Sequence, residues 1–211
     1  MTCEFILVRH GETESNAAGL LHGRTDVPLN AVGQRQATQV ADHLASIGRI
    51  VALYASPLTR ARATADPISR SLGLTTTERV GLAEIDFGAI EGLPAVEFAT
   101  RYPELFARLQ NPTGDDAGFP RGESILAFHE RVHQSLRFLA SEHRGERIVV
   151  VAHGGVIASG IAQLIGNGPA AWSDYLVRNC SVTRLTWDGE RAELHCLDDV
   201  SHLAAAVGPP R

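Results

Sequence analysis

Apolar positions along the chain form short continuous runs that alternate with longer stretches of helical period. The short runs, each of a length typical of a buried strand, lie at 4–8, 50–55 and 147–152. In two of the longer stretches, 32–47 and 125–139, apolar side chains recur every three or four residues, as they do along one face of a helix. Strands that alternate with helices in this way predict an α/β fold, a three-layer α/β/α sandwich around a mainly parallel sheet.

The C-terminal region predicts a departure from this alternation. Residues 181–197 contain two strand-like runs on either side of Asp188-Gly189, a dipeptide typical of a two-residue hairpin turn. We expect this hairpin to extend the sheet in an antiparallel direction, which would make the sheet mixed. The loosest stretch of chain is 111–122, where proline, glycine and two adjacent aspartates interrupt the flanking patterns, and we expect it to form a loop beside the functional site.

Length and composition limit the kind of protein. With 211 residues, 44% of them hydrophobic, the chain can bury one substantial core, so we expect a single domain over 1–211 with an excursion around 92–122. A formal net charge of -5 provides no basic field for nucleic acid or for an anionic membrane, so we expect neither as a partner. No apolar run approaches the roughly 20 residues of a membrane span, and the cysteines form no CxxC pair. A cytoplasmic location is therefore expected, and a homodimer is compatible with the sequence.

Charged and histidine side chains follow each of the predicted parallel strands. Arg9 and His10 come after the first strand, Arg60 follows the second, and His153 with Gly154 follows the third. Because ligands of parallel sheets gather outside the carboxyl ends of the strands, we expect these residues to meet at one edge of the sheet.

This set of side chains matches what phosphoryl transfer requires. Arg9 and Arg60 offer guanidinium groups whose fork geometry fits a phosphate, and a neutral His10 can attack phosphorus as a nucleophile. His153 could bind phosphate as a cation. The amides of Gly154 and the glycine after it, at the start of a helix, could bind the same anion.

A general acid is also required, because a departing alkoxide must be protonated as its bond to phosphorus breaks. Glu84, which follows a short threonine-rich strand, is our candidate, and the nearby Asp86 and Glu91 are alternatives for the same role. A noncatalytic module that binds phosphoproteins would need only the arginines. The presence of His10 and His153 together with Glu84 therefore favours an enzyme.

The order and spacing of several motifs resemble a known family. The matching segments span the chain from Phe5 to about Leu203 and are Arg9-His10-Gly11-Glu12-Thr13 with Asn16, Ser56-Pro57-Leu58-Thr59-Arg60-Ala61 with Thr64-Ala65, 84–92, Gly122-Glu123-Ser124 and Ala152-His153-Gly154-Gly155. In this order they resemble the histidine phosphatase superfamily, the phosphoglycerate mutase-like clan. The resemblance implies the fold of that clan and a metal-independent phosphomonoesterase that acts on a small phosphate ester, with neither metal nor cofactor.

The resemblance also implies roles for individual residues. The catalytic and phosphate-binding residues that it implies are Arg9, His10, Arg60, Glu84 and His153. His10 would carry the phosphoryl group, and Glu84 would transfer the proton. Asn16, Gly23 and Gly154 would lie against the substrate, and the excursion around 92–122 would cover it.

Within the clan, the chain resembles the small phosphatases, including those named for alpha-ribazole phosphate, phosphoserine and sugar phosphates, more than the cofactor-dependent mutases. Mutases usually carry a paired-arginine segment after the acid region, whereas 105–119 holds Arg108 alone and then Asp115-Asp116. Mutase-like phosphoryl transfer is therefore the alternative function.

Some further residues are candidate substrate contacts. His22 and Arg24 flank Gly23 in the loop that we expect to face the substrate. Arg121 stands where relatives often have glycine, and an extra cation there could select a carboxylate or a phosphate of the substrate. A solvated loop arginine is the alternative interpretation of Arg121.

A zinc hydrolase is the alternative from a different class. Residues 129–133 read His-Glu-Arg-Val-His, a formal HExxH match that would place both histidines on one helical face. Leu136 and Leu139 stand where the extended motif has glycine and histidine. The apolar stripe through the same segment is typical of core packing, which is the interpretation we favour.

Overall fold

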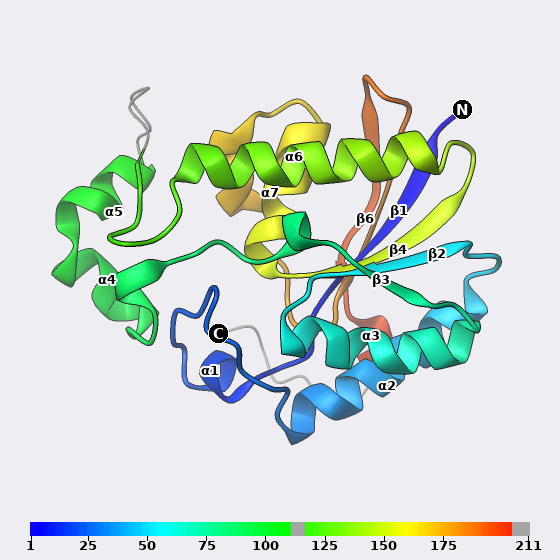
Figure 1. Ribbon diagram of the computed structural model, residues 1–211, viewed down its shortest axis with the longest axis horizontal. Coiled ribbons are helices and arrows are strands. Elements are labelled where there is room, and N and C mark those ends of the chain that lie inside the picture. The colour runs from blue at the N-terminus through cyan, green and yellow to red at the C-terminus, as the bar shows by residue number, and fades with distance from the viewer. Residues whose placement is uncertain (111–116, 204–211) are drawn as a thin grey trace.

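A mixed sheet of six strands, in the order β3-β2-β4-β1-β5-β6, runs through the middle of the computed structural model (Figure 1), which describes residues 1–110 and 117–203. The strands are β1 (Cys3–Arg9), β2 (Ala52–Ala55), β3 (Thr76–Glu78), β4 (Arg147–Ala152), β5 (Val182–Trp187) and β6 (Ala192–Asp199). The first four are parallel, and β5 and β6 form an antiparallel hairpin beside β1. The predicted mixed, mainly parallel sheet is confirmed.

Helices fill the connections between the strands. The α-helices are α1 (Glu14–Ala17), α2 (Ala31–Ser46), α3 (Thr59–Leu72), α4 (Ala95–Arg101), α5 (Pro103–Gln110), α6 (Ile125–Glu142) and α7 (Gly154–Leu164). The short 3-10 helices are η1 (Val80–Leu82), η2 (Gly88–Ile90), η3 (Pro169–Tyr175) and η4 (Ser201–Leu203). The two stretches of helical period in the sequence correspond to α2 and α6, as predicted.

The helices form layers on the two faces of the sheet, with α6 and α7 on one face and α2 and α3 on the other (Figure 1). Successive side chains of a strand point to opposite faces, so β1 supplies both layers of the core. Phe5 and Leu7 pack in the cluster that contains α6 and α7, whereas Ile6 and Val8 pack in the cluster that contains α2 and α3. This α/β/α sandwich is the predicted fold, and it places β1 and β4 at the centre of the molecule.

The hairpin turn between β5 and β6 differs from the prediction by one residue. The amide of Asp188 donates to the carbonyl of Arg191 at 3.1 Å, which centres the turn on Gly189 and Glu190 rather than on Asp188-Gly189. The carboxylate of Asp188 accepts the amides of Glu190 and Arg191 at 2.8 and 2.7 Å, and Gly189 adopts a φ of 108°. Asp188 therefore acts as the first residue of the turn, because its side chain bonds the backbone ahead of it.

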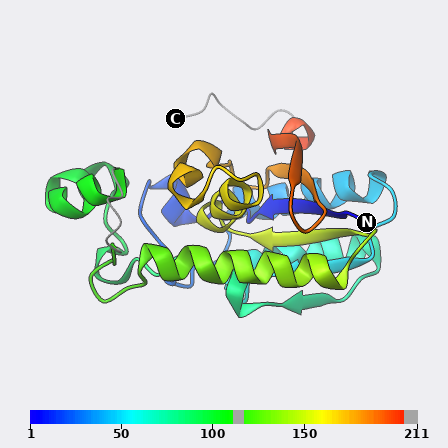
Figure 2. The ribbon, with the colours of Figure 1, turned by 90° about the horizontal axis from the view of Figure 1, so that it is seen from above.

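The excursion between η2 and α6 contains two helices that the sequence did not predict. Helices α4 and α5 lie at one end of the molecule, beyond the sheet in both views (Figures 1 and 2). The ring of Phe98 on α4 lies 6.3 Å from the ring of Phe119, which ties the excursion back to the chain before α6. The predicted loop at 111–122 is described only from 117 onward, and 111–116, with Asp115 and Asp116, lie outside the described residues.

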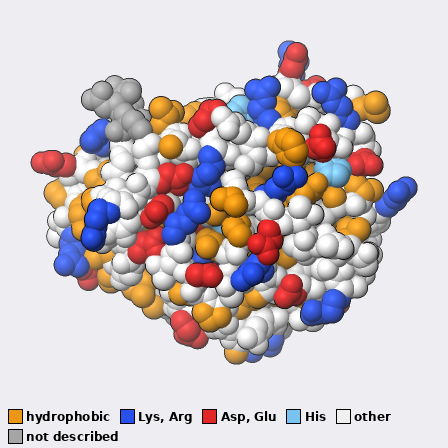
Figure 3. All heavy atoms as spheres, viewed as in Figure 1, with side chains coloured by type: hydrophobic (Ala, Val, Ile, Leu, Met, Phe, Trp, Pro, Cys, Tyr) orange, Lys and Arg blue, Asp and Glu red, His pale blue; other side chains and the backbone are white. Residues whose placement is uncertain are grey.

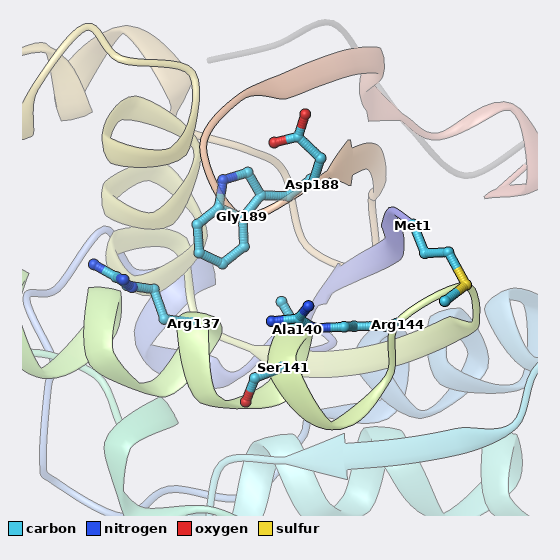
Figure 4. A pocket seen from close by; sticks show the side chains of 8 residues that line it. Met1, Arg137, Ala140, Ser141, Arg144, Asp188 and Gly189 are labelled. Carbon is cyan, nitrogen blue, oxygen red and sulfur yellow. The ribbon is translucent and has the colours of Figure 1, made fainter.

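The surface has no strongly charged face in the view of Figure 3, where acidic and basic side chains are interspersed. Within the described ranges, no helix has the length and apolar character needed to cross a membrane. A small pocket lies between α6 and the hairpin turn, lined among others by Met1, Arg137 and Trp187 (Figure 4). It lies beside the first residue of the chain, so it is at the edge of the sheet opposite the carboxyl end of β1.

The HExxH segment takes part in packing between α6 and α7. His129 is 3% exposed, and its Nδ1 lies 2.7 Å from the hydroxyl of Ser159 on α7. Its ring also meets the ring of Trp172 edge to face, with centroids 5.5 Å apart. Among the residues that the structure describes, no group of three or more histidine, cysteine or carboxylate side chains could hold a metal ion. The packing interpretation of this segment is therefore favoured.

The core contribution of α6 can be tested with two leucines on the same helix. Leu136 is 2% exposed and Leu126 is 62% exposed. We expect Leu136→Ala to lower the free energy of unfolding by about 3 kcal/mol, because it leaves a cavity, and Leu126→Ala to change it by less than about 0.5 kcal/mol. Denaturant unfolding followed by circular dichroism measures both, and equal effects would contradict this packing.

Burial of His129 predicts a pH-dependent stability. Burial lowers the pKa of His129 to about 4, so between pH 6.5 and 4 the unfolded chain takes up a proton that the folded chain refuses. Stability from this group is therefore complete above pH 6.5 and falls as the pH drops toward 4. Between pH 6.5 and pH 4 the free energy of unfolding should fall in both proteins. We expect the fall to be about 3 kcal/mol smaller in His129→Asn than in the wild type. Parallel pH profiles of the two proteins would contradict the prediction.

Candidate active site

The carboxyl ends of the central strands bring the predicted residues together. Arg9 is the last residue of β1 and pairs with Ala152 of β4, and the amide of His10 donates to the carbonyl of Ala152 at 3.0 Å. The rings of His10 and His153 consequently lie 5.1 Å apart. Arg60 reaches the same edge from the first turn of α3, which follows β2. The convergence expected from the strand order is thus present in the structure.

His10 is held as a neutral imidazole with one free nitrogen. Its side chain is 2% exposed, and Nδ1 lies 2.7 Å from the carbonyl oxygen of Gly11, which can only accept a hydrogen bond. The proton therefore resides on Nδ1, and the lone pair resides on Nε2. Burial lowers the pKa of His10 well below its ordinary value, and the neighbouring Arg9 and Arg60 lower it further. This state is the one that a nucleophilic histidine needs.

The two arginines are fixed by backbone carbonyls and retain open donors. Arg60 is fully buried and donates from its terminal nitrogens to the carbonyls of Gly23 at 2.7 Å and Thr25 at 3.1 Å. Arg9 donates to the carbonyl of Val177 at 2.6 Å. The buried Nε of each arginine has no hydrogen-bond partner among the described residues. An anion with several oxygens would satisfy these donors.

His153 contributes a further open donor. Its Nε2 lies 2.7 Å from the hydroxyl of Ser56, which can donate to it, and with the hydroxyl as the donor the imidazole proton lies on Nδ1. The buried Nδ1 has no partner within the described part of the chain. Burial lowers the pKa of His153 well below its ordinary value, and Arg60 lowers it further. Both effects favour a neutral His153 over the cation we expected, and in that form it can offer phosphate an N–H.

The carboxyl group of Glu84 is positioned by the start of α7. Glu84 is 8% exposed, and its two oxygens accept the amides of Ile85 and Gly155, each at 3.0 Å. A Cβ at Gly155 would lie 2.6 Å from a carboxylate oxygen of Glu84, so this contact requires glycine. We expected the amides at Gly154 and Gly155 to bind the phosphate, but the amide of Gly155 is used by Glu84. Gly154 lies against Arg9, whose Nε would be 3.5 Å from a Cβ there, and a phosphate contact through the amide of Gly154 stays a prediction.

The alternative acids, Asp86 and Glu91, are engaged in shaping loops. Glu91 accepts the amides of Arg24 and Thr25, each at 2.7 Å, and Asp86 accepts the amide of Gly88 at 2.8 Å. Burial would raise the pKa of Glu91, but the hydrogen bonds from Thr25 and Arg24 outweigh it and hold the pKa below its ordinary value. An ionised carboxylate is a poor general acid, so these contacts disfavour Glu91 for that role.

Asn16 and Gly23, the predicted substrate neighbours, have distinct places. Asn16 lies in α1, where its side-chain oxygen accepts the amide of Thr13 at 3.2 Å and the side-chain amide of Asn179 at 3.2 Å. Neither contact uses the side-chain amide nitrogen of Asn16, which can therefore donate to another partner. Gly23 packs so tightly on the carbonyl of Ile85 that a Cβ would lie 1.8 Å from that oxygen.

The three candidate substrate contacts differ in their surroundings. His22 is half-buried with its ring 6.2 Å from the ring of His10, so it belongs to the pocket. Arg24 follows Gly23, and its buried Nε has no partner among the described residues. Arg121 is exposed and has a φ of 59°, a left-handed conformation that favours glycine. This backbone explains why glycine suits the position of Arg121.

Two residues that touch the site were missed from the sequence. Asn179 donates from its side chain to the carbonyl of His10 at 2.9 Å, and Ser56 bonds His153. Asn179 precedes β5, which begins at the edge where β1 ends because the two strands are antiparallel. The predicted antiparallel hairpin was therefore the available signal for Asn179. Ser56 lay in a recognised motif, but its pairing with His153 depends on tertiary packing.

The family model and the similar sequences point to the same family. A family model described as the histidine phosphatase superfamily (branch 1) matches residues 5–200. The metal-independent phosphoserine phosphatase of Arabidopsis thaliana is 34% identical over 203 residues, which cover 96% of this chain and 84% of that protein. The phosphoglycerate mutase-like protein 4 of the same plant is 36% identical over 204 residues, which cover 95% of this chain and 86% of that protein.

Solved structures agree with the sequence relatives. The phosphoserine phosphatase of Entamoeba histolytica in complex with 3-phosphoglyceric acid is 28% identical, with a TM-score of 0.83 over 95% of this chain and 99% of that one. The alpha-ribazole phosphatase of Shigella flexneri is 28% identical, with a TM-score of 0.80 over 93% of this chain and 96% of that one. The phosphatases among these relatives support the predicted hydrolysis of phosphate monoesters. The predicted family is confirmed: the chain belongs to the histidine phosphatase superfamily.

Proposed function

We propose that the protein hydrolyses the phosphate ester of a small metabolite through a phosphohistidine intermediate on His10. The observation that carries this proposal is the neutral, buried His10 with Nε2 free, among open donors of Arg9, Arg60 and His153. A phosphate dianion would satisfy those donors and present its phosphorus to the imidazole. Histidine is one of the side chains that form covalent intermediates, and as the nucleophile it acts without a metal ion.

The first step of the proposed mechanism breaks the ester bond. Nε2 of His10 attacks phosphorus in line, and the bond from phosphorus to the alcohol oxygen breaks as the new P–N bond forms. The donors of Arg9, Arg60 and His153 bind the non-bridging oxygens, where charge is spread in the transition state. Protonated Glu84 gives its proton to the leaving oxygen, so the product leaves as a neutral alcohol.

The second step releases inorganic phosphate. Water attacks the phosphohistidine, Glu84 takes the proton from that water, and the P–N bond breaks to return the lone pair to Nε2 of His10. Glu84 is thereby protonated again and ready for another ester. The same carboxyl group serves as acid and then as base, and the amide of Gly155 holds it at the start of α7 in both steps.

Substrate selection belongs to the loops around this pocket. We assign contacts with the alcohol part of the substrate to Asn16, His22, Gly23 and Arg24, with Arg121 as a further candidate at the rim. The excursion at 92–122 would cover the bound ester, and together with the sandwich it forms one domain. Phosphoserine phosphatases and alpha-ribazole phosphatases among the similar proteins support a small phosphorylated metabolite as the substrate class.

A mutase-like transfer is the second candidate function. It is supported by a relative named as phosphoglycerate mutase-like, which is 36% identical to this chain. Such a transfer would use the same phosphohistidine but return the phosphoryl group to a second hydroxyl rather than to water. Conversion of phosphoglycerate isomers primed with bisphosphoglycerate measures it, and we expect hydrolysis to exceed isomerisation.

We also propose a cytoplasmic enzyme with no nucleic-acid or membrane partner. The cysteines Cys3, Cys180 and Cys196 are free thiols, as is usual in a reducing compartment. The net charge of -5 supports the absence of polyanionic partners. A homodimer is compatible with the proposal.

The nucleophile is tested by replacing His10. We expect His10→Ala to lower turnover of p-nitrophenyl phosphate by about four orders of magnitude, because the nucleophile that forms the phosphohistidine is then missing. Activity of the wild type should persist in EDTA, since no metal takes part. His195→Ala, at the other end of the sheet on β6, is the matched control and should retain full turnover. Near-normal turnover by His10→Ala would refute the assignment.

The proton donor is tested by the dependence of rate on the leaving group. We expect Glu84→Gln to lower turnover of glycerol 2-phosphate, a poor leaving group, by about 10²–10³-fold, because the alkoxide then departs unprotonated. Turnover of p-nitrophenyl phosphate, whose leaving group is stable as an anion, should fall far less. Equal slowing of both esters would assign the acid to another residue.

A further inference from the structure

The segment that carries Glu84 has little regular structure of its own. Between β3 and α4 the chain forms only the two short turns η1 and η2, and Glu84 lies between them. A catalytic carboxyl must be held within about 0.5 Å of its working position, which a loop does not do unaided. The amide of Gly155 in α7 holds the side chain of Glu84, but the backbone of this segment needs support of its own.

Arg131 of α6 fixes that backbone with three of its five N–H donors. From one terminal nitrogen it donates to the carbonyls of Gly81 at 3.1 Å and Ala83 at 2.6 Å, and from the other to the carbonyl of Glu84 at 3.3 Å. Its remaining N–H groups donate to the two carboxylate oxygens of Glu123, each at 2.7 Å. All five N–H donors of the guanidinium are therefore used inside the protein.

Glu123 completes the hold on the far side of Glu84. Its amide donates to the carbonyl of Asp86 at 2.8 Å, and its carboxylate accepts the amide of Asp86 at 3.4 Å. Burial would raise the pKa of Glu123, but hydrogen bonding to Arg131 outweighs it and keeps the pKa below its ordinary value. The side chains of Arg131 and Glu123 are 19% and 16% exposed, so the pair is largely shielded from water.

We propose that Arg131, paired with Glu123, is a positioning residue for the proton-transfer step, holding the backbone on both sides of Glu84 so that its carboxyl group faces the leaving oxygen. The inference rests on the proposed role of Glu84. Arg131 cannot bind the phosphate, because its donors are already used and Glu123 balances its charge. Lysine cannot replace it, because an ammonium group has three donors and no planar fork.

The test compares two esters in Arg131→Lys and in Glu123→Gln, a second variant that keeps the shape of the carboxylate. We expect each to lower kcat for glycerol 2-phosphate by about 10²-fold, the usual effect of a displacement of about 1 Å, and to change kcat for p-nitrophenyl phosphate by less than about 3-fold. KM should change little for either ester, because the phosphate pocket is untouched. Arg137→Lys, on the same helix beside the pocket of Figure 4, is the matched control and should leave both rates unchanged.

The double variant Arg131→Lys with Glu84→Gln separates positioning from a general loss of structure. If Arg131 acts through Glu84, the double variant should be no slower on glycerol 2-phosphate than Glu84→Gln alone. Multiplicative losses, or equal slowing of both esters together with a lower melting temperature, would overturn the proposal in favour of a structural role. If Glu84→Gln itself shows no leaving-group dependence, the proposed function fails at Glu84, and the positioning role fails with it.

Discussion

Two guanidinium groups, each with a buried Nε and no ion pair to a described residue, are the constraint on which the rest of the site depends. Arg9 and Arg60 have no ion pair with any described residue, and both are held by neutral backbone carbonyls. Removing a cation from water costs several kcal/mol unless charge or hydrogen bonds compensate for it. The fold bears that cost at the carboxyl ends of its central strands, where a bound phosphate can offset it. Burial holds the pKa of His10 and of His153 well below the ordinary value, and the field of the arginines lowers both further, so one arrangement attracts the anion and prepares the nucleophile.

The components of the site differ in how they are supported. His10 and His153 follow β1 and β4, which lie side by side in the centre of the sheet and fix the positions of the two histidines. Glu84 lies on a chain segment outside the sheet, so its position depends on contacts with two helices, α7 through the amide of Gly155 and α6 through Arg131. This difference in support has a physical reason. The phosphate end, which meets His10 and His153, is the same in every ester, whereas the alcohol end, which Glu84 protonates, varies.

Much of this could be read from the sequence, for reasons that are local. The apolar runs at 4–8 and 147–152 predicted buried strands, and residues after such strands meet at one edge, which located Arg9, His10 and His153 correctly in space. What failed depended on contacts between distant segments. The charge state of His153 follows from burial beside Arg60, and the amide of Gly155 turned out to bond Glu84. Neither the burial of His153 beside Arg60 nor the bond between Gly155 and Glu84 leaves a periodic or compositional signal in the sequence.

The central claim is that the phosphoryl group passes through His10. Its most direct test is to mix the enzyme with excess glycerol 2-phosphate, quench the reaction in alkali during turnover, and locate added phosphoryl groups by peptide mass spectrometry. The mechanism predicts one phosphoryl group on the peptide that contains His10, with attachment at the imidazole. A phosphoryl group on another residue, or enzyme that stays unmodified throughout turnover, would contradict it.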